Sequence, residues 1–266
     1  MIYGRDYSPQ GDFTANFAPD LLIQKSKALS IVPLTIDSNQ VVSAQLPEGS
    51  YISLPSTITL EAGKLPKKTK LCAALDFDNG GVSDLLVQEG KTKLKLFKLF
   101  NEGSPVTPTV LSEIDFTLPK KHRYLGAGAL TGNKDDTLDL VLKKGKELLL
   151  AENLGSSFST NLSSVSGKLG KGKVLSIQKD RFILQKGRKL LQQSVTDLTL
   201  GTQTELGTLA KGQKAAAILD INQDGKLDVV TVDKKRNVGF VSEDNLSATP
   251  TALVTLPKGT KVVGPK

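Results

Sequence analysis

A short lysine-rich phrase recurs five times along the chain, and this repetition constrains the fold more than any other feature. The copies are KLPKKTK at 64–70, LPKKHR at 118–123, KLGKGK at 168–173, LAKGQK at 209–214 and LPKGTK at 256–261. Successive copies lie about 40 to 50 residues apart, a period typical of propellers and related repeat architectures. The chain is therefore expected to build one supersecondary unit several times.

The segments between the phrases predict β-strands. Apolar runs such as LCAALDF, YLGAGAL, VLSIQ and AAAILDI follow the first four phrases, and further short runs rich in Val, Ile and Leu come next. Runs of this kind, bounded by Gly, Asp, Asn and Lys, are typical of strands joined by turns. We predict an all-β fold, a small four-bladed β-propeller whose units cover about residues 69–120, 121–171, 172–212 and 213–260.

The ends of the repeat region leave the closure of the ring open. Residues 57–65 (TITLEAGKL) have the pattern of a fourth strand ahead of the first unit. Residues 260–264 (TKVVG) have the pattern of a first strand behind the last unit. We assign residues 57–266 to the propeller, with a fifth, partial blade as the alternative to four.

Residues 1–56 lack the phrase and are expected to form a separate small β-module ahead of the propeller. LSIVPLTI, QVVSAQLP and SYISLP have the pattern of short strands between DSN and PEG turns. Charge divides the chain in the same way, because residues 1–60 are acidic on balance while the net charge of the whole chain is +8. This asymmetry predicts an anionic partner for the propeller.

Between the first two strands of the last unit, the sequence LDINQDGKLDVV has the spacing of a calcium loop. Calcium takes six to eight oxygen ligands, and alternate residues of a tight loop can direct several of them at one centre. The candidate ligands are the side chains of Asp220, Asn222, Asp224 and Asp228 and the carbonyl of Lys226. An EF-hand is excluded, because Thr231 stands where its glutamate belongs and the flanks are strands.

Degenerate copies of this loop occur in earlier units. The first unit offers Asp76, Asp78 and Asp84, with Gly80 in place of one acidic ligand. The second offers Asn133, Asp135 and Asp139, with Thr131 at the first position. The third has shrunk to QKDRF. A polar hairpin turn without metal is the alternative for each loop, and each lost carboxylate weakens the case for calcium.

These loops resemble the FG-GAP/VCBS propeller repeats of integrin α chains and related lectins, in which a calcium loop links the two inner strands of a blade. The segments NEGSPV at 101–106 and ENLGSSFS at 152–159 also resemble that repeat, although the FG-GAP phrase itself is absent. The resemblance covers the four units and implies that calcium is structural. It also implies adhesion or recognition on a face of the disc, more than catalysis.

Because neighbouring strands are antiparallel, the lysine phrases and the turns between second and third strands are expected on one face. The candidate ligand-binding residues of that basic face are Lys120, Lys121, Arg123, Lys143, Lys144, Lys171, Lys173, Arg188, Lys234, Lys235 and Arg236. Such a face attracts anionic glycans, lipid phosphates or an acidic protein surface. Solubility alone is the alternative. Nucleic acid is disfavoured, because aromatic stacking platforms and binding motifs are missing.

The remaining signals argue against an enzyme and against a membrane protein. GKLGKGKV at 167–174 resembles a phosphate loop but has Val174 where Ser or Thr is required. His122 is the only histidine, so no hydrolytic triad can be assembled. The single cysteine, Cys72, lies in an apolar run and is expected to be an inert core residue. No apolar run reaches the length of a membrane span, and no signal peptide is expected.

These observations lead to one functional expectation and one alternative. We expect a virion spike that mediates host-cell attachment. Residues 1–56 would anchor it to a capsid vertex protein, and the calcium-stabilised propeller would present the recognition surface. This layout is similar to the spike of membrane-containing, corticovirus-type phages. The expected setting is the virion surface, the expected partner is a host glycan or another anionic receptor, and a homo-oligomer is expected. The alternative is a calcium-dependent, glycan-binding lectin of the propeller type.

Overall fold

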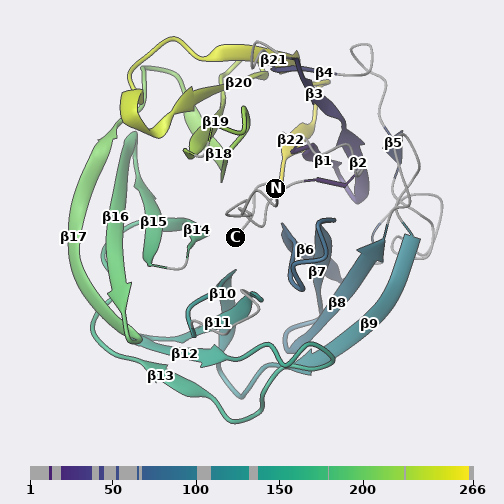
Figure 1. Cartoon of the computed structure of the whole chain (residues 1–266), viewed down its shortest axis with the longest axis vertical. Helices are drawn as coiled ribbons and strands as arrows, with labels where there is room; N and C mark the ends of the chain where they lie inside the picture. Colours follow the sequence, from purple (N-terminus) through teal and green to yellow (C-terminus); the bar gives the residue numbers. More distant parts are fainter. Residues whose placement is uncertain are drawn as a thin grey trace, which may run out of the picture.

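The computed structural model of the chain is a ring of small antiparallel sheets around a central axis (Figure 1). It describes residues 12–13, 19–37, 42–44, 52–53, 65, 68–100, 109–131, 137–178, 180–224 and 226–263. Five four-stranded sheets form the blades of a β-propeller-like disc, and the first strand of each blade lies nearest the centre.

Blades 2 to 5 are each built from four consecutive strands. Blade 2 contains β6 (Thr69–Leu75), β7 (Asp84–Glu89), β8 (Lys93–Phe100) and β9 (Thr109–Thr117). Blade 3 contains β10 (Arg123–Gly128), β11 (Asp139–Lys144), β12 (Glu147–Ala151) and β13 (Ser163–Val165). Blade 4 contains β14 (Lys173–Ile177), β15 (Arg181–Lys186), β16 (Lys189–Thr196) and β17 (Thr199–Thr208). Blade 5 contains β18 (Lys214–Leu219), β19 (Asp228–Val232), β20 (Asn237–Ser242), the 3-10 turn η1 (Glu243–Asn245) and β21 (Thr251–Thr255).

Blade 1 joins the two ends of the chain. Its innermost strand is the C-terminal β22 (Thr260–Val262), and β1 (Leu21–Lys25), β2 (Ala28–Val32) and β5 (Ile52–Ser53) follow outward. β22 runs antiparallel to β1, with Ile23 opposite Val262. A two-stranded ribbon of β3 (Leu34–Ile36) and β4 (Val42–Ala44) lies between β2 and β5 in the sequence.

The prediction of four blades is therefore wrong by one. Residues 21–53, expected in a separate N-terminal module, supply three strands of a fifth blade. The strand expected at 260–264 is present as β22, and it completes that blade from the other end of the chain. Apart from Leu65, the strand expected at 57–65 lies outside the described residues. Five copies of the lysine phrase correspond to five connections between successive blades, because the ring closes on itself.

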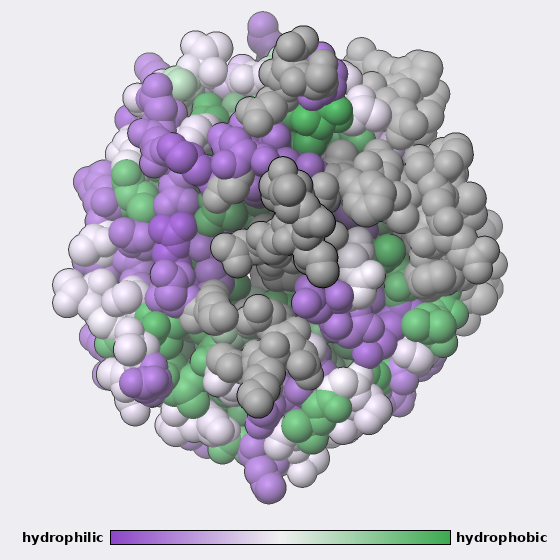
Figure 2. Space-filling model, in the orientation of Figure 1, coloured by the Kyte–Doolittle hydropathy of each residue, from purple (hydrophilic) through white to green (hydrophobic). Residues whose placement is uncertain are grey.

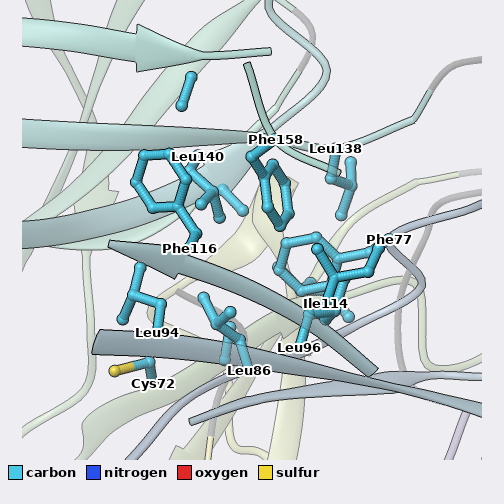
Figure 3. Close-up of a cluster of buried hydrophobic side chains, with 14 of the residues drawn as sticks. Cys72, Phe77, Leu86, Leu94, Leu96, Ile114, Phe116, Leu138, Leu140 and Phe158 are labelled. Atoms are coloured by element: carbon cyan, nitrogen blue, oxygen red, sulfur yellow. The ribbon is translucent and has the colours of Figure 1, made fainter. Parts of the chain in front are cut away.

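The core consists of layers of aliphatic side chains between neighbouring blades. Between blades 2 and 3, residues of both sheets meet around Leu86, Leu140 and Phe158 (Figure 3). Phe158 packs edge-on against Phe77 and Phe116, with ring centroids 6.4 Å and 5.9 Å away. Because each blade is covered on both sides by its neighbours, the middle strands read as continuous apolar runs instead of alternating patterns.

Cys72 lies buried in the same layer and outside any disulfide, which agrees with the core position expected for it (Figure 3). The part of the chain that the structure describes contains no helix of the length and hydrophobicity needed to cross a membrane.

Candidate metal centre and basic face

Strand direction assigns each connection to one of the two faces of the disc. The connections between first and second strands, which hold the candidate metal loops, share one face with those between third and fourth strands. We call this the loop face. The turns between second and third strands and the lysine phrases lie on the opposite face, which we call the basic face. Figure 2 shows one face of the disc, with hydrophilic side chains gathered over blades 4 and 5 and apolar ones in small separate patches.

A buried aspartate begins the second strand of three blades. Asp84, Asp139 and Asp228 are the first residues of β7, β11 and β19, and each is at most 2% exposed. Asp84 accepts hydrogen bonds from the backbone N–H of Phe77 (3.0 Å) and of Leu99 (2.8 Å). One carboxylate thus fastens the loop before the second strand to the end of the third strand.

Asp139 repeats both contacts of this arrangement, and Asp228 repeats the contact with the loop. Asp139 accepts from the backbone N–H and the hydroxyl of Thr131 (3.1 and 2.9 Å) and from the N–H of Asn153 (2.9 Å). Asp228 accepts from the N–H of Ile221 at 3.0 Å. Carboxylates in this setting satisfy backbone donors that would otherwise be buried without a partner, so they stabilise the loop with or without a metal.

Sequence reasoning missed a fourth member of this set, Asp20. Its carboxylate accepts from the N–H of Phe13 (2.9 Å) and of Leu34 (3.1 Å), the same two kinds of donor that Asp84 uses. The signal was available, because Asp12 and Asp20 have the spacing of Asp76 and Asp84. The prediction of a separate module for residues 1–56 takes no account of this spacing.

The structure brings together the carboxylates of Asp76, Asp78 and Asp84. One oxygen from each lies within 4.8 Å of the others. The two oxygens of Asp76 accept the backbone N–H groups of Gly80 and Gly81 at 2.9 and 2.7 Å. Among the described residues this is the one acidic triplet with metal-ligand separation.

The electrostatics of this cluster favour an added positive charge. Burial raises the pKa of Asp84 to about 8, and the charge of Asp78 adds to the shift. Burial likewise raises the pKa of Asp76 to about 6. Lys98 approaches Asp78 with its Nζ 3.1 Å from Oδ2. Three close carboxylates fit the ligand preference of a divalent cation such as calcium, which would replace the protons and compete with Lys98.

The loop that matches the calcium pattern best in sequence is more open. The N–H of Asp224 donates to Asp220 Oδ1 (3.2 Å) and to Asn222 Oδ1 (3.3 Å). Burial raises the pKa of Asp228 to about 7, and the charges of Asp224 and Asp220 contribute. The side chain of Lys226 turns away to Asp244, at 2.8 Å. The carboxylates of this loop do not form a triplet as close as the one around Asp76.

Two other loops complete the account of the predicted sites. Asn133 and Asp135 lie outside the described residues, whereas burial raises the pKa of Asp139 in the same loop. In blade 4, where the loop has shrunk, Arg181 begins the second strand and donates to Gln178 and Gln192, both at 2.9 Å. Sequence reasoning did not identify this substitution of an arginine network for an aspartate.

Backbone hydrogen bonds join the two kinds of turn on the basic face. The first leucine of a lysine phrase donates its N–H to a carbonyl in the turn between second and third strands of the preceding blade. The pairs are Leu65 to Lys27 (2.8 Å), Leu118 to Thr92 (2.7 Å), Leu209 to Arg188 (3.0 Å) and Leu256 to Arg236 (3.0 Å). Each of these leucines is at most 3% exposed, so it anchors the phrase while the described lysines of the phrase remain exposed.

Almost every described cation belongs to the basic face. Lys95, Lys98, Arg181 and Lys226 are the exceptions; all other described Lys and Arg lie in these turns and connections or within two residues of them. The predicted members of the face are exposed, except for Lys143, which is half-buried. The described acidic residues in the same segments are Glu89, Glu147 and Asp233. Lysine-rich turns on one side and buried aspartates on the other give the disc two faces of opposite character.

Comparison with protein-family models and with curated protein sequences finds no match to this chain. The resemblance to calcium-loop propellers is supported at the level of a propeller-like ring of antiparallel sheets.

Proposed function

We propose that the protein is an attachment protein on the surface of a virion, and that its disc binds an anionic receptor on the host cell. The observation that carries the proposal is the segregation of charge, with the cations gathered on the basic face. A rigid disc with one strongly basic side attracts polyanions over the range of a Debye length and orients them before contact. Binding, not catalysis, is the role that such a surface performs.

Calcium is proposed as a structural component of the loop face. Asp76, Asp78 and Asp84 would supply the principal ligands, and the loop from Asp220 to Asp228 would supply a second set. The ion would neutralise carboxylates whose burial disfavours the charged form. It would thereby hold the inner two strands of a blade together without taking part in recognition.

The proposed virion setting rests on the similarity of layout with the spikes of corticovirus-type phages. In that setting residues 1–56 contact a capsid vertex protein, and the protein is a homo-oligomer. Since residues 21–53 also build blade 1, this blade would lie next to the capsid. A protein that meets its receptor in calcium-rich medium would gain its loop-face stability at the place where it works.

A calcium-dependent lectin of the propeller type is the second candidate. One observation favours it: the described residues from both ends of the chain close a single ring, so the described part contains no anchor separate from the disc. In this case recognition of glycans would be the complete function, without a capsid partner.

Competition for cell binding tests the attachment proposal. Soluble protein, added to host cells before the particle, is expected to reduce particle adsorption in proportion to receptor occupancy. Antibody labelling should locate the protein at particle vertices by electron microscopy. Adsorption that is indifferent to the soluble protein, together with particles that carry no label, would reject the virion role. Glycan binding by the same sample would then support the lectin.

A further inference from the structure

Five cations occupy equivalent positions on the innermost strands, one in each blade. They are Lys70 of β6, Arg123 of β10, Lys173 of β14, Lys214 of β18 and Lys261 of β22, and all five are exposed. We call them the axial cations. Each is the first or second residue of its strand, at the point where the chain enters from the basic face.

The pairing register shows that these positions are equivalent. Lys70, Arg123, Lys173 and Lys261 each pair with the penultimate residue of the second strand, and Lys214 pairs with the last. In blades 2 to 5, an irregularity in the register follows two residues after the axial cation. The same bulge at the same place means that the inner strands enter the ring in the same way.

The fold places these residues around the axis. The inner strands form the central edge of every sheet and surround the middle of the disc (Figure 1). The turn before the inner strand is tight, because Lys68, Lys121, Gly212 and Gly259 adopt positive φ of 66°, 67°, 92° and 83°. Buried leucines anchor the same turns to the preceding blade. In four of the five blades the backbone just ahead of the axial cation is thus held in place.

Nothing in the described protein neutralises these five charges. None of the axial cations forms an ion pair with a described residue, whereas Lys93, Lys144 and Lys189, which lie farther out, pair with acidic side chains. The five lysine phrases contain no acidic residue. Like charges gathered around one axis repel one another, so a bound anion would relieve an unfavourable interaction and gain five favourable ones.

We propose that the axial cations bind a linear glycan that carries sulfate or phosphate esters, with the chain lying across the axis of the basic face. This inference rests on the proposed attachment function and assigns its receptor class. A glycan is favoured over a bilayer, because the exposed large apolar residues of the described chain, Leu111 and Leu154, lie toward the loop face. It is favoured over nucleic acid, because Tyr124 and His122, the aromatic residues beside Arg123, are half-buried and offer no fully exposed ring for stacking.

Two variants of equal charge test the proposal. The axial variant carries Lys70→Gln, Arg123→Gln, Lys173→Gln, Lys214→Gln and Lys261→Gln. The rim variant carries Lys25→Gln, Lys91→Gln, Lys146→Gln, Lys186→Gln and Lys235→Gln, one exposed lysine of each blade in or directly beside the turn between its second and third strands. Affinity is measured for heparin as the sulfated glycan, phosphomannan as the phosphorylated one and dextran as the neutral control. Thermal unfolding verifies that both variants are folded.

Wild-type protein is expected to bind heparin or phosphomannan and not dextran, with affinity that falls as salt increases. The axial variant should lose at least about tenfold in affinity and much of the salt dependence, and the rim variant less than about threefold. Equal losses in the two variants, or no binding by the wild type, would overturn the axial site. Equal affinity of the axial site for single-stranded DNA or phosphatidylserine vesicles would overturn the glycan assignment. If particles that carry the axial variant no longer bind glycan but still adsorb to cells, the glycan is not the receptor. That outcome would overturn this inference and leave the attachment function standing.

Discussion

Arg181 and Glu243 form a bidentate ion pair between blades 4 and 5, with Nη1 2.8 Å from Oε1 and Nη2 3.0 Å from Oε2. Arg181 begins the second strand of blade 4, where the other blades carry a buried aspartate. Both side chains are largely buried, at 24% and 16% exposure. Planar, doubly hydrogen-bonded pairs of this kind have strong geometric preference, so they fix the relative position of two blades.

Replacement of Glu243 by Gln should destabilise the disc by about 1–3 kcal/mol, because it leaves the guanidinium of Arg181 partly buried without its charged partner. The free energy of unfolding in denaturant measures the effect. Asp244→Asn is the matched control. Asp244 is the next residue in the chain, and its ion pair with Lys226 is exposed. That control should leave the unfolding midpoint unchanged. If the two variants lower the free energy of unfolding equally, the ion pair between the blades contributes no more than an exposed pair.

The buried aspartates predict a stability that falls as the pH rises in metal-free buffer. Burial raises the pKa of Asp84 from 3.8 to about 8, and that of Asp228 from 3.8 to about 7. Between the unfolded and folded pKa values the folded chain binds more protons, so each group lowers the free energy of unfolding by at most about 1.4 kcal/mol per pH unit. Their contribution is complete below pH 3.8 and is lost by about pH 8.

Thermal unfolding in chelator from pH 5 to 9 measures this dependence. Asp84→Asn and Asp228→Asn should each reduce the slope, because an amide does not titrate. Asp115→Asn, at an exposed position of β9, is the control and should retain the wild-type slope. A slope that is the same in all four proteins would show that these two groups do not titrate in this range.

Calcium should raise the melting temperature, by several degrees if it saturates the loop-face sites, because it binds the folded state alone. Asp78→Ala should remove the larger part of this rise and Asp224→Ala a smaller part, since the carboxylates are closest around Asp76.

Lys98→Ala should increase the calcium affinity, because the ammonium group of Lys98 competes with calcium for Asp78. The affinity should also increase between pH 6 and 8, as the buried carboxyl groups lose protons.

Differential scanning calorimetry with calcium and with EDTA gives these values, and magnesium is the control ion. A larger effect of Asp224→Ala than of Asp78→Ala would mean that the principal calcium site is the loop from Asp220 to Asp228, as the sequence pattern suggests. No change with calcium in the wild type would exclude the metal from both loops.

Removal of β22 should abolish the closed ring. Truncation after Gly259 deletes the strand that pairs with β1 and the N–H of Val263, which donates to the carbonyl of Leu22 at 2.8 Å. The inner edge of β1 would then expose unpaired backbone groups. We expect a melting temperature lower by more than about 10 °C and a loss of cooperative unfolding.

Truncation after Val263 is the control for this variant, because it leaves β22 complete. Circular dichroism measures both transitions. If the shorter protein unfolds like the longer one, the ring does not depend on its closure by the C-terminal strand.

Much of a single blade could be predicted from local sequence. Apolar runs and turn residues identified the strands of blades 2 to 5, and the spacing of Asp220 and Asp228 identified the loops. The role of the last aspartate of each loop could be predicted only in part. The sequence pattern suggests a metal ligand, whereas the structure shows that Asp139 is occupied by backbone and hydroxyl donors. Hydrogen-bond partners that lie a whole strand away leave no trace in a nine-residue pattern.

The contacts between distant segments could not be predicted in the same way. β1 and β22 are neighbours although more than about 230 residues separate them in the chain, and Arg181 meets Glu243 across a blade boundary. The five axial cations were among the many basic residues of the repeated phrases, but their place at the centre depends on the ring having five blades.

The sequence by itself determined the blade, because strand, turn and buried aspartate are specified by residues that are close along the chain. It also determined that the cations and the aspartates lie on opposite faces, since antiparallel strands reverse direction at every turn. The tertiary structure alone decided the number of blades and the strand that closes the ring. The physical reason is that closure depends on the angle at which neighbouring sheets pack, and that angle is the joint result of side chains from different blades.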